Sequence, residues 1–262
     1  MSRRDAYLTA AMPTLRSLEA LEREGLLSPD PRLEAAAQSM AIAVTPEMAA
    51  LIDRADFARD PIARQFVPSA AEAEVSPQEL ADPIGDEFRS PVKGIVHRYP
   101  DRVLLKPLHV CPVYCRFCFR REKVGPGGEA LSAEELDAAL AYIRARPEIW
   151  EVILTGGDPL MLAPRRLGEL LAALDAMPHV AVIRIHSRVP VADPGRVTDE
   201  LIAALRPHRA GVWLAVHCNH ARELTAGARS ALTRLANAGL PLMAQTVLLK
   251  GVNDDEIGRA HV

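Results

Sequence analysis

The amino-acid sequence predicts an α/β protein, a parallel sheet or partial (βα) barrel preceded by a helical region. From about residue 102, short apolar runs alternate with stretches of helical periodicity, which gives five predicted strands with four helices between them. Polar or glycine residues follow all five predicted strands. Because ligands gather at the carboxyl ends of strands in such folds, this pattern predicts an active site there.

The first 95 residues are predicted to form a small helical region and a wrapping segment. Residues 14–27 repeat apolar side chains at helical spacing, and Thr45 followed by Pro46 is typical of a helix start. Residues 61–91 are rich in proline and acidic residues, which favours short helices and extended connections. We therefore place the boundary of the barrel after residue 95.

Residues 96–255 are predicted to form the barrel part. Ser132, with Glu135 three residues later, forms a capping box at a helix start, and Gly239 stands where a C-terminal glycine is expected. The residues that follow the predicted strands are Cys111, Thr155–Asp158, His186–Arg188, His217–His220 and Gln245.

Composition excludes several classes of protein. Apolar residues make up 49% and charged residues 25% of the 262 residues, as in an ordinary globular chain with a sizeable core. A formal net charge of −3 gives no general attraction to nucleic acid or to an anionic membrane. No apolar run reaches the roughly 18 residues of a membrane span, and the N-terminus lacks the apolar region of a secretory signal. Since the four cysteines accompany no export signal, we predict a cytoplasmic protein.

Three of the four cysteines, Cys111, Cys115 and Cys118, form the pattern C-x3-C-x2-C after the first predicted barrel strand. Three closely spaced thiolates can hold three corners of a 4Fe–4S cluster and leave the fourth iron for a small molecule. The alternative is a structural zinc site completed by a histidine such as His109. Zinc ribbons more often use two C-x2-C pairs, so we favour the cluster. Cys218 is predicted to be a small buried apolar residue.

Six motifs carry a resemblance to a known family. They are HRYPDRVLL (97–105), CPVYCRFCFRR (111–121), TGGDPL (155–160), RIHSRVP (184–190), HCNH (217–220) and QTVLLKGVND (245–254). The cysteine pattern resembles that of radical S-adenosylmethionine (SAM) enzymes, and the six motifs in this order resemble the lysine 2,3-aminomutase family. The resemblance implies a partial barrel of the radical SAM type.

The resemblance also implies how the cluster and SAM are bound. The three cysteines of the pattern would hold the cluster, and SAM would chelate the open iron. Reduction of the cluster would cleave SAM to a 5′-deoxyadenosyl radical that abstracts a substrate hydrogen. Phe117 would lie near the adenine, where lysine aminomutases commonly carry histidine. The other implied SAM contacts are Gly156, Gly157 and Asp158 at the amino end, with His217 and Gln245.

The family also uses pyridoxal phosphate (PLP), which carries the migrating amino group. Arg98, Tyr99 and Arg102 match its phosphate-binding positions, and Arg120 matches the arginine that faces the substrate carboxylate. Guanidinium groups suit both anions because they donate paired hydrogen bonds. The alternative for Arg98 and Arg102 is solvated charge at a strand edge.

Two expectations concern the C-terminal end. A closed barrel needs further βα units after the last predicted strand. In the family, the Schiff-base lysine and the acidic substrate-binding residues also lie well after GVND. We therefore expect a C-terminally truncated sequence. Ile257–Val262 match the translation of a sequencing adapter, and we interpret residues 256–262 as a candidate non-native tail. Asp255 stands where characterised members tend to carry a cysteine for an intersubunit zinc ion.

The resulting prediction is a radical SAM, PLP-dependent isomerase that converts an amino acid, with L-lysine to β-lysine favoured. Alternatives with the same chemistry are glutamate or another amino acid as substrate, and (R)-β-lysine production for modification of elongation factor P. Phe117 and the absence of a cysteine directly after GVND both favour the last of these. An alternative of a different class is a non-catalytic zinc-binding protein. The resemblance implies an electron donor such as flavodoxin or ferredoxin, and whether the chain forms a homo-oligomer is left open.

Overall fold

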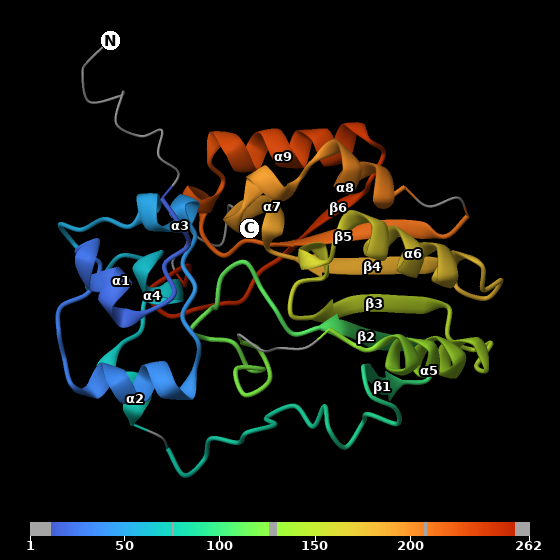
Figure 1. Ribbon diagram of the computed structural model, residues 1–262, viewed down its shortest axis with the longest axis horizontal. Helices are drawn as coiled ribbons and strands as arrows, with labels where there is room; N and C mark the ends of the chain where they lie inside the picture. The colour runs from blue at the N-terminus through green and yellow to red at the C-terminus, as the bar shows by residue number, and fades with distance from the viewer. Residues whose placement is uncertain (1–11, 75, 126–129, 207–208, 255–262) are drawn as a thin grey trace.

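The computed structural model describes residues 12–74, 76–125, 130–206 and 209–254. Within them, six strands form one open sheet in the order β1-β2-β3-β4-β5-β6, as Figure 1 shows. β1 pairs antiparallel with β2, whereas β2 to β6 are parallel, so the predicted α/β class is confirmed. The strands are β1 (Ile95–Tyr99), β2 (Arg102–Leu108), β3 (Glu151–Gly156), β4 (Val182–Ser187), β5 (Gly211–His217) and β6 (Leu242–Gln245).

The helices between the parallel strands begin and end where the sequence signals predict. The Ser132 side chain accepts from the Glu135 N–H in a complete capping box, and Gly239 takes a positive φ of 87° after the last helix. The long helices are α5 (Ala133–Arg144), α6 (Pro164–Asp175) and α9 (Ala226–Asn237). The shorter ones are η3 (Pro159–Met161), α7 (Val189–Ala192), η4 (Pro194–Arg196), α8 (Asp199–Ala204) and η5 (Ala221–Glu223).

The helical region lies at the carboxyl ends of the parallel strands (Figure 1). Its helices are α1 (Leu18–Arg23), α2 (Arg32–Ser39), α3 (Pro46–Leu51), α4 (Ala63–Phe66) and η2 (Ala70–Ala73). Thr45 caps α3 by accepting from the Met48 N–H, as predicted. One buried apolar cluster extends from Leu15 of this region to Leu240 before β6, so the region packs on the core of the sheet. The boundary after residue 95 stays a prediction, and the predicted tail lies outside the described residues.

Two elements differ from the sequence prediction. β1 was not predicted, because only its first two residues are buried and its apolar pattern is correspondingly weak. A strand was predicted over residues 240–249, but β6 ends at Gln245. Beyond it, hydrogen bonds from side-chain amides replace the hydrogen bonds of the sheet. Asn219 Oδ1 accepts from the Val247 N–H at 3.0 Å, and Asn253 Nδ2 donates to the Asn219 carbonyl at 2.9 Å. These side-chain bonds hold the chain in a turn instead of extending the strand.

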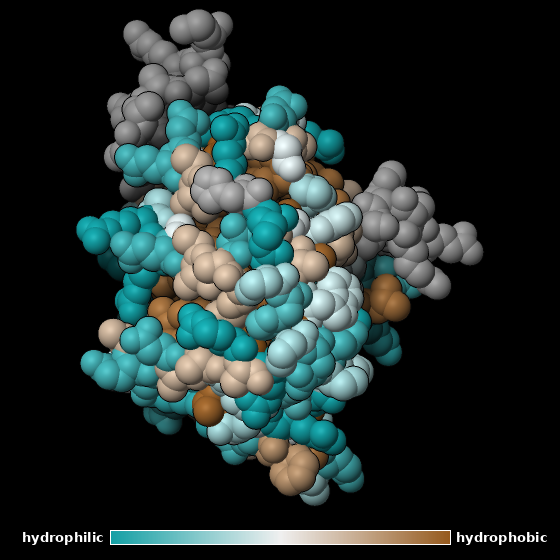
Figure 2. All heavy atoms as spheres, turned by 90° about the vertical axis from the view of Figure 1, so that its right-hand side faces the viewer, coloured by the Kyte–Doolittle hydropathy of each residue, from teal (hydrophilic) through white to brown (hydrophobic). Residues whose placement is uncertain are grey.

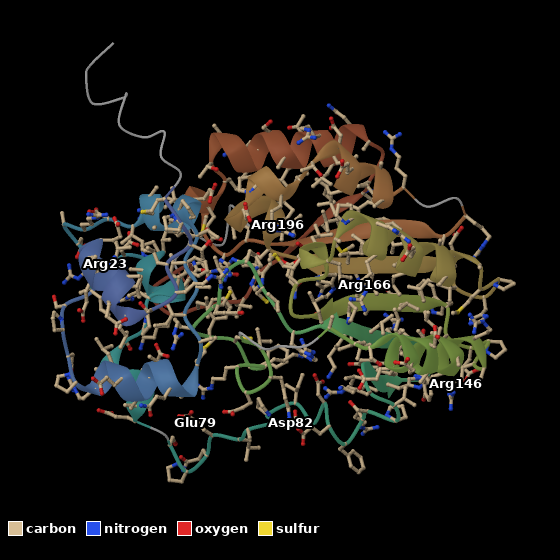
Figure 3. The ribbon with its side chains drawn as sticks, viewed as in Figure 1. Arg23, Glu79, Asp82, Arg146, Arg166 and Arg196 are labelled. Carbon is tan, nitrogen blue, oxygen red and sulfur yellow. The ribbon has the colours of Figure 1, made fainter. Side chains whose placement is uncertain are left out.

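Residues 76–94, the described C-terminal part of the acid-rich wrapping segment, run along the loop that contains the cysteines. Glu79 and Asp82 mark this segment in Figure 3. Its acidic residues, with Glu72 just before it, pair with basic residues of that loop. The four ion pairs are Glu72–Arg116, Glu79–Arg121 (2.9 Å), Asp86–Arg120 (2.9 Å) and Glu87–Lys123 (2.6 Å). The acidic composition of the segment is therefore matched by the basic residues that follow the cysteines.

The amino ends of the parallel strands face the viewer in Figure 2. Hydrophilic side chains cover most of this face, and apolar areas are small and separate. Among the helices of the described residues, none has the length and apolar character needed to cross a membrane.

Candidate functional site

A cavity of about 200 Å³ lies at the carboxyl ends of the parallel strands. The residues predicted for the cluster and for SAM all line it, together with Arg120. They are Cys111, Cys115, Phe117, Cys118, Arg120, Gly156, Gly157, Asp158, His217 and Gln245. The fold thus brings together ten residues that lie up to 134 positions apart in the sequence.

The three cysteines of the pattern are partly buried in the wall of this cavity. Burial raises the pKa of the Cys111 thiol, and the nearby Asp158, Cys115 and Cys118 raise it further. Three sulfur donors lining one cavity fit a 4Fe–4S cluster in type and number. In the described part of the chain, no group of three or more His, Cys, Asp or Glu side chains forms a preformed metal site.

Arg188, directly after β4, is a residue of this site to which the sequence analysis gave no role. Its Nη1 atom lies 3.1 Å from Cys115 Sγ, and its Nη2 atom donates to Glu223 Oε2 at 2.6 Å and to Gln65 Oε1 at 2.7 Å. The side chains of Arg188 and Glu223 are 5% and 0% exposed. Because a buried charge needs a partner, this ion pair fixes the guanidinium beside the cysteine. The signals for Arg188 in the sequence are its place directly after a predicted strand and within the motif of residues 184–190.

Gly156 and Gly157 let the end of β3 approach the chain just before Cys111. The Gly157 N–H donates to the Leu108 carbonyl at 2.8 Å. A Cβ on Gly157 would lie 2.4 Å from the Val110 carbonyl oxygen, and Gly156 has a φ of +109°. Both positions therefore require glycine to form this turn.

The Asp158 carboxylate joins the ends of β3 and β4. Its Oδ2 atom accepts from the N–H groups of Arg188 at 2.7 Å and Val189 at 3.2 Å, and its Oδ1 atom accepts from Leu160 at 3.0 Å. Burial raises the pKa of this carboxyl, while the hydrogen bonds oppose that rise. Asp158 thus positions the segment that carries Arg188, and its contact with SAM stays a prediction.

Two histidines that line the same cavity have buried ring nitrogens. Among the residues that the structure describes, none is a hydrogen-bond partner of the Nε2 atom of His186 or of His217. Burial, with smaller effects of nearby arginines, lowers the pKa of His186 to about 4 and that of His217 to about 3. Both rings are therefore neutral at pH 7 and can each exchange one hydrogen bond with a ligand. The Phe117 ring meets the His217 ring edge-on, with centroids 5.9 Å apart.

The residues predicted for the PLP phosphate lie together at a second cavity, of about 310 Å³. Arg98, Tyr99 and Arg102 line it, with Arg184 from β4 as a third guanidinium that the sequence analysis did not single out. Arg102 and Arg184 lie 3.2 and 2.9 Å from the carboxylate oxygens of Glu151. Arg102 also pairs with Asp101 at 3.0 Å, so carboxylates already offset part of the positive charge at this cavity. The three guanidinium groups still supply hydrogen-bond donors of the kind that suit a phosphate.

Comparison with known proteins identifies the class. Residues 105–261 match the family model described as the radical SAM superfamily, and the chain belongs to that superfamily. Its curated relatives narrow the resemblance to the lysine 2,3-aminomutase family, as predicted.

Three relatives illustrate the similarity. The chain is 42% identical over 217 residues to L-lysine 2,3-aminomutase of Clostridium subterminale, covering 83% of this chain and 52% of that protein. It is 39% identical over 243 residues to the Bacillus subtilis (strain 168) L-lysine 2,3-aminomutase, covering 92% and 51%. It is 38% identical over 214 residues to glutamate 2,3-aminomutase of Clostridioides difficile (strain 630), covering 82% and 50%. The chain thus spans about half the length of these relatives.

Proposed function

We propose that the protein is a radical SAM, PLP-dependent 2,3-aminomutase that moves the α-amino group of an amino acid, with L-lysine to β-lysine as the favoured reaction. The observation that carries this proposal is the single cavity lined by the ten residues that match the family's motifs. The names of the relatives, which include lysine and glutamate 2,3-aminomutases, support the reaction class.

Different residues of the first cavity would bind the cluster and SAM. Bound there, the cluster and SAM would supply a 5′-deoxyadenosyl radical, and PLP would supply an amino-group carrier. The three thiolates would hold the cluster, with Arg188 fixing Cys115. The atoms nearest to a Cβ built on Gly157 are backbone atoms of His109 and Val110, so this turn holds the end of β3 directly against the chain before Cys111. The neutral His217 ring and the Gln245 amide would offer uncharged hydrogen-bonding groups to SAM.

The second cavity would hold the PLP phosphate through Arg98, Tyr99 and Arg102. Arg120, in the wall of the first cavity, would then bind the substrate carboxylate. Guanidinium groups can donate two parallel hydrogen bonds to either anion, which fixes orientation as well as charge. This division would place the amino-acid substrate between the phosphate site and the cysteines.

Substrate identity is tested with the protein expressed from its full gene, reconstituted anaerobically with iron, sulfide, SAM and PLP. L-lysine and L-glutamate are supplied separately, and β-amino acids are measured by chromatography. We expect β-lysine from L-lysine. β-Glutamate alone would instead establish the glutamate reaction, and SAM cleavage with neither product would overturn the free amino-acid mutase.

The proposal extends to the cellular setting. A cytoplasmic location would supply flavodoxin or ferredoxin as the electron donor for the cluster. The second candidate function, supply of (R)-β-lysine to elongation factor P, is favoured by Phe117, which packs against His217 in the cavity. Chirality of the β-lysine product distinguishes it, because this pathway requires the R enantiomer.

A further inference from the structure

Asp86, Lys106 and Arg120 form a cluster of buried charges. Arg120 Nε donates to Asp86 Oδ2 at 2.9 Å, and Lys106 Nζ lies 3.6 Å from the same oxygen. The three side chains are only 10–14% exposed. Two largely buried cations therefore share one carboxylate.

The cluster lies where the two cavities meet. Arg120 lines the cavity of the cysteines, and Asp86 lines the cavity of Arg98 and Arg102. The ion pair between Arg120 and Asp86 thus connects the walls of both cavities. A ligand that contacted the lining of both cavities at this point would lie beside this pair.

Asp86 reaches the cluster from the wrapping segment, whereas Lys106 belongs to β2. The Asp82 carboxylate accepts from the N–H groups of Asp86 and Glu87 at 2.9 and 2.8 Å and so shapes the turn that presents Asp86. Asp82 lies on this segment in Figure 3. The side chain that satisfies the two cations is therefore carried by a loop and not by the sheet.

Lys106 differs from the other lysines of the chain. The sequence contains four, and Lys93, Lys123 and Lys250 are exposed. Lys106 is 13% exposed in its side chain, and burial lowers the pKa of its amine. A buried ammonium is costly unless an anion lies beside it. The carboxylate of Asp86 contacts both this ammonium and the Arg120 guanidinium, and the more distant Asp82 carboxylate also favours the charged form of Lys106.

We propose that Lys106 and Arg120 form a two-cation site for a carboxylate, and that Asp86 occupies it in the ligand-free chain. The carboxylate of an amino-acid substrate enters by exchange with Asp86. The identity of this ligand rests on the proposed function, whereas the site itself rests on the contacts of the three side chains. Lys106 thereby becomes a binding residue beside Arg120.

Competition for the site provides the test. Asp86→Asn removes the internal carboxylate and nearly conserves its shape. We expect acetate, the probe, to bind the Asp86→Asn chain at least tenfold more tightly than the unaltered chain, as measured by thermal shift or calorimetry. The gain should disappear in the double variant Asp86→Asn/Lys106→Met. Glu79→Gln, which breaks a more exposed pair of the same segment with Arg121, is the matched control and should show no gain.

Several outcomes would overturn the site. They are an unchanged acetate affinity in Asp86→Asn, a gain that sodium chloride reproduces at equal ionic strength, or the same gain in Glu79→Gln. If Asp86→Asn does not fold, Lys106→Met in the otherwise unaltered chain replaces it. That variant should bind acetate at least threefold more weakly, and an unchanged affinity contradicts the proposal.

The outcome is separable from that of the proposed function. A chain that gains acetate affinity in Asp86→Asn but never cleaves SAM has the site without the proposed reaction. A chain that cleaves SAM but shows no difference between Asp86→Asn and Glu79→Gln has the reaction without the site.

Discussion

The guanidinium of Arg188 lies 3.1 Å from Sγ of Cys115. Arg188 follows β4, Cys115 lies in the loop after β2, and the paired Glu223 lies in η5 after β5. Gln65, in α4, completes the group from the helical region. One buried cation thus connects three strand ends and the helical region, so the position of the cysteine loop depends on residues far from it in sequence.

Removing the partner of this cation should cost stability. Glu223→Gln leaves the Arg188 charge buried without its counter-ion, and we expect the free energy of unfolding to fall by about 3 kcal/mol. Chemical denaturation measures the change. The matched control is Glu169→Gln, which breaks the exposed pair with Arg165 and should cost less than about 1 kcal/mol. Equal effects of the two substitutions would show that Arg188 does not depend on Glu223.

Gly157→Ala should disturb the turn against the cysteine loop. Its Cβ would lie 2.4 Å from a backbone oxygen, so the chain must shift, and we expect a loss of about 1–3 kcal/mol in unfolding free energy. Gly168→Ala in α6 is the control, because its Cβ would lie 3.6 Å from the nearest atom. That substitution should stabilise the helix by roughly 0.5–1 kcal/mol. A Gly157→Ala chain as stable as the unaltered one would contradict the close approach.

The buried histidines should make the fold sensitive to acid. The pKa of His217 is lowered to about 3, so between pH 6.5 and pH 3 the unfolded chain takes up a proton that the folded chain does not. Stability due to this difference is complete above about pH 6.5 and decreases as the pH falls. Between pH 7 and pH 5, the unaltered chain should lose about 1–2 kcal/mol more than His217→Gln. Identical pH profiles of unfolding free energy would refute the assignment.

The arginines of the second cavity should determine affinity for PLP. Arg102→Gln removes one guanidinium from that cavity, and we expect the Kd for PLP to rise about tenfold, since a charge-assisted bond contributes about 1.5 kcal/mol. Absorbance titration of the chain with PLP measures this. Arg165→Gln, on the exposed surface of α6, should leave the Kd unchanged. If Arg102→Gln also leaves it unchanged, PLP does not use this cavity.

The sequence predicted the parallel sheet well because buried strands and amphipathic helices alternate with strong periodicity. The polar residues after each strand could likewise be expected to meet, since parallel strands share one carboxyl edge. The contacts of Arg188 could not be predicted from the sequence, because its partners Glu223 and Gln65 lie 35 and 123 positions away from it. The role of Asp86 could not be predicted for a related reason. Nothing about an acidic residue in a proline-rich segment indicates that it contacts two buried cations, Lys106 and Arg120.

The most direct test of the central claim is reductive cleavage of SAM by the anaerobically reconstituted chain, with 5′-deoxyadenosine measured by chromatography. Cys218→Ala is the matched control, because Cys218 borders a separate apolar pocket. We expect a brown protein with visible cluster absorbance and SAM cleavage for the unaltered chain and for Cys218→Ala. Each of Cys111→Ala, Cys115→Ala and Cys118→Ala should abolish the cleavage. A colourless zinc-binding protein, or full cleavage in any one of these three variants, would contradict the account.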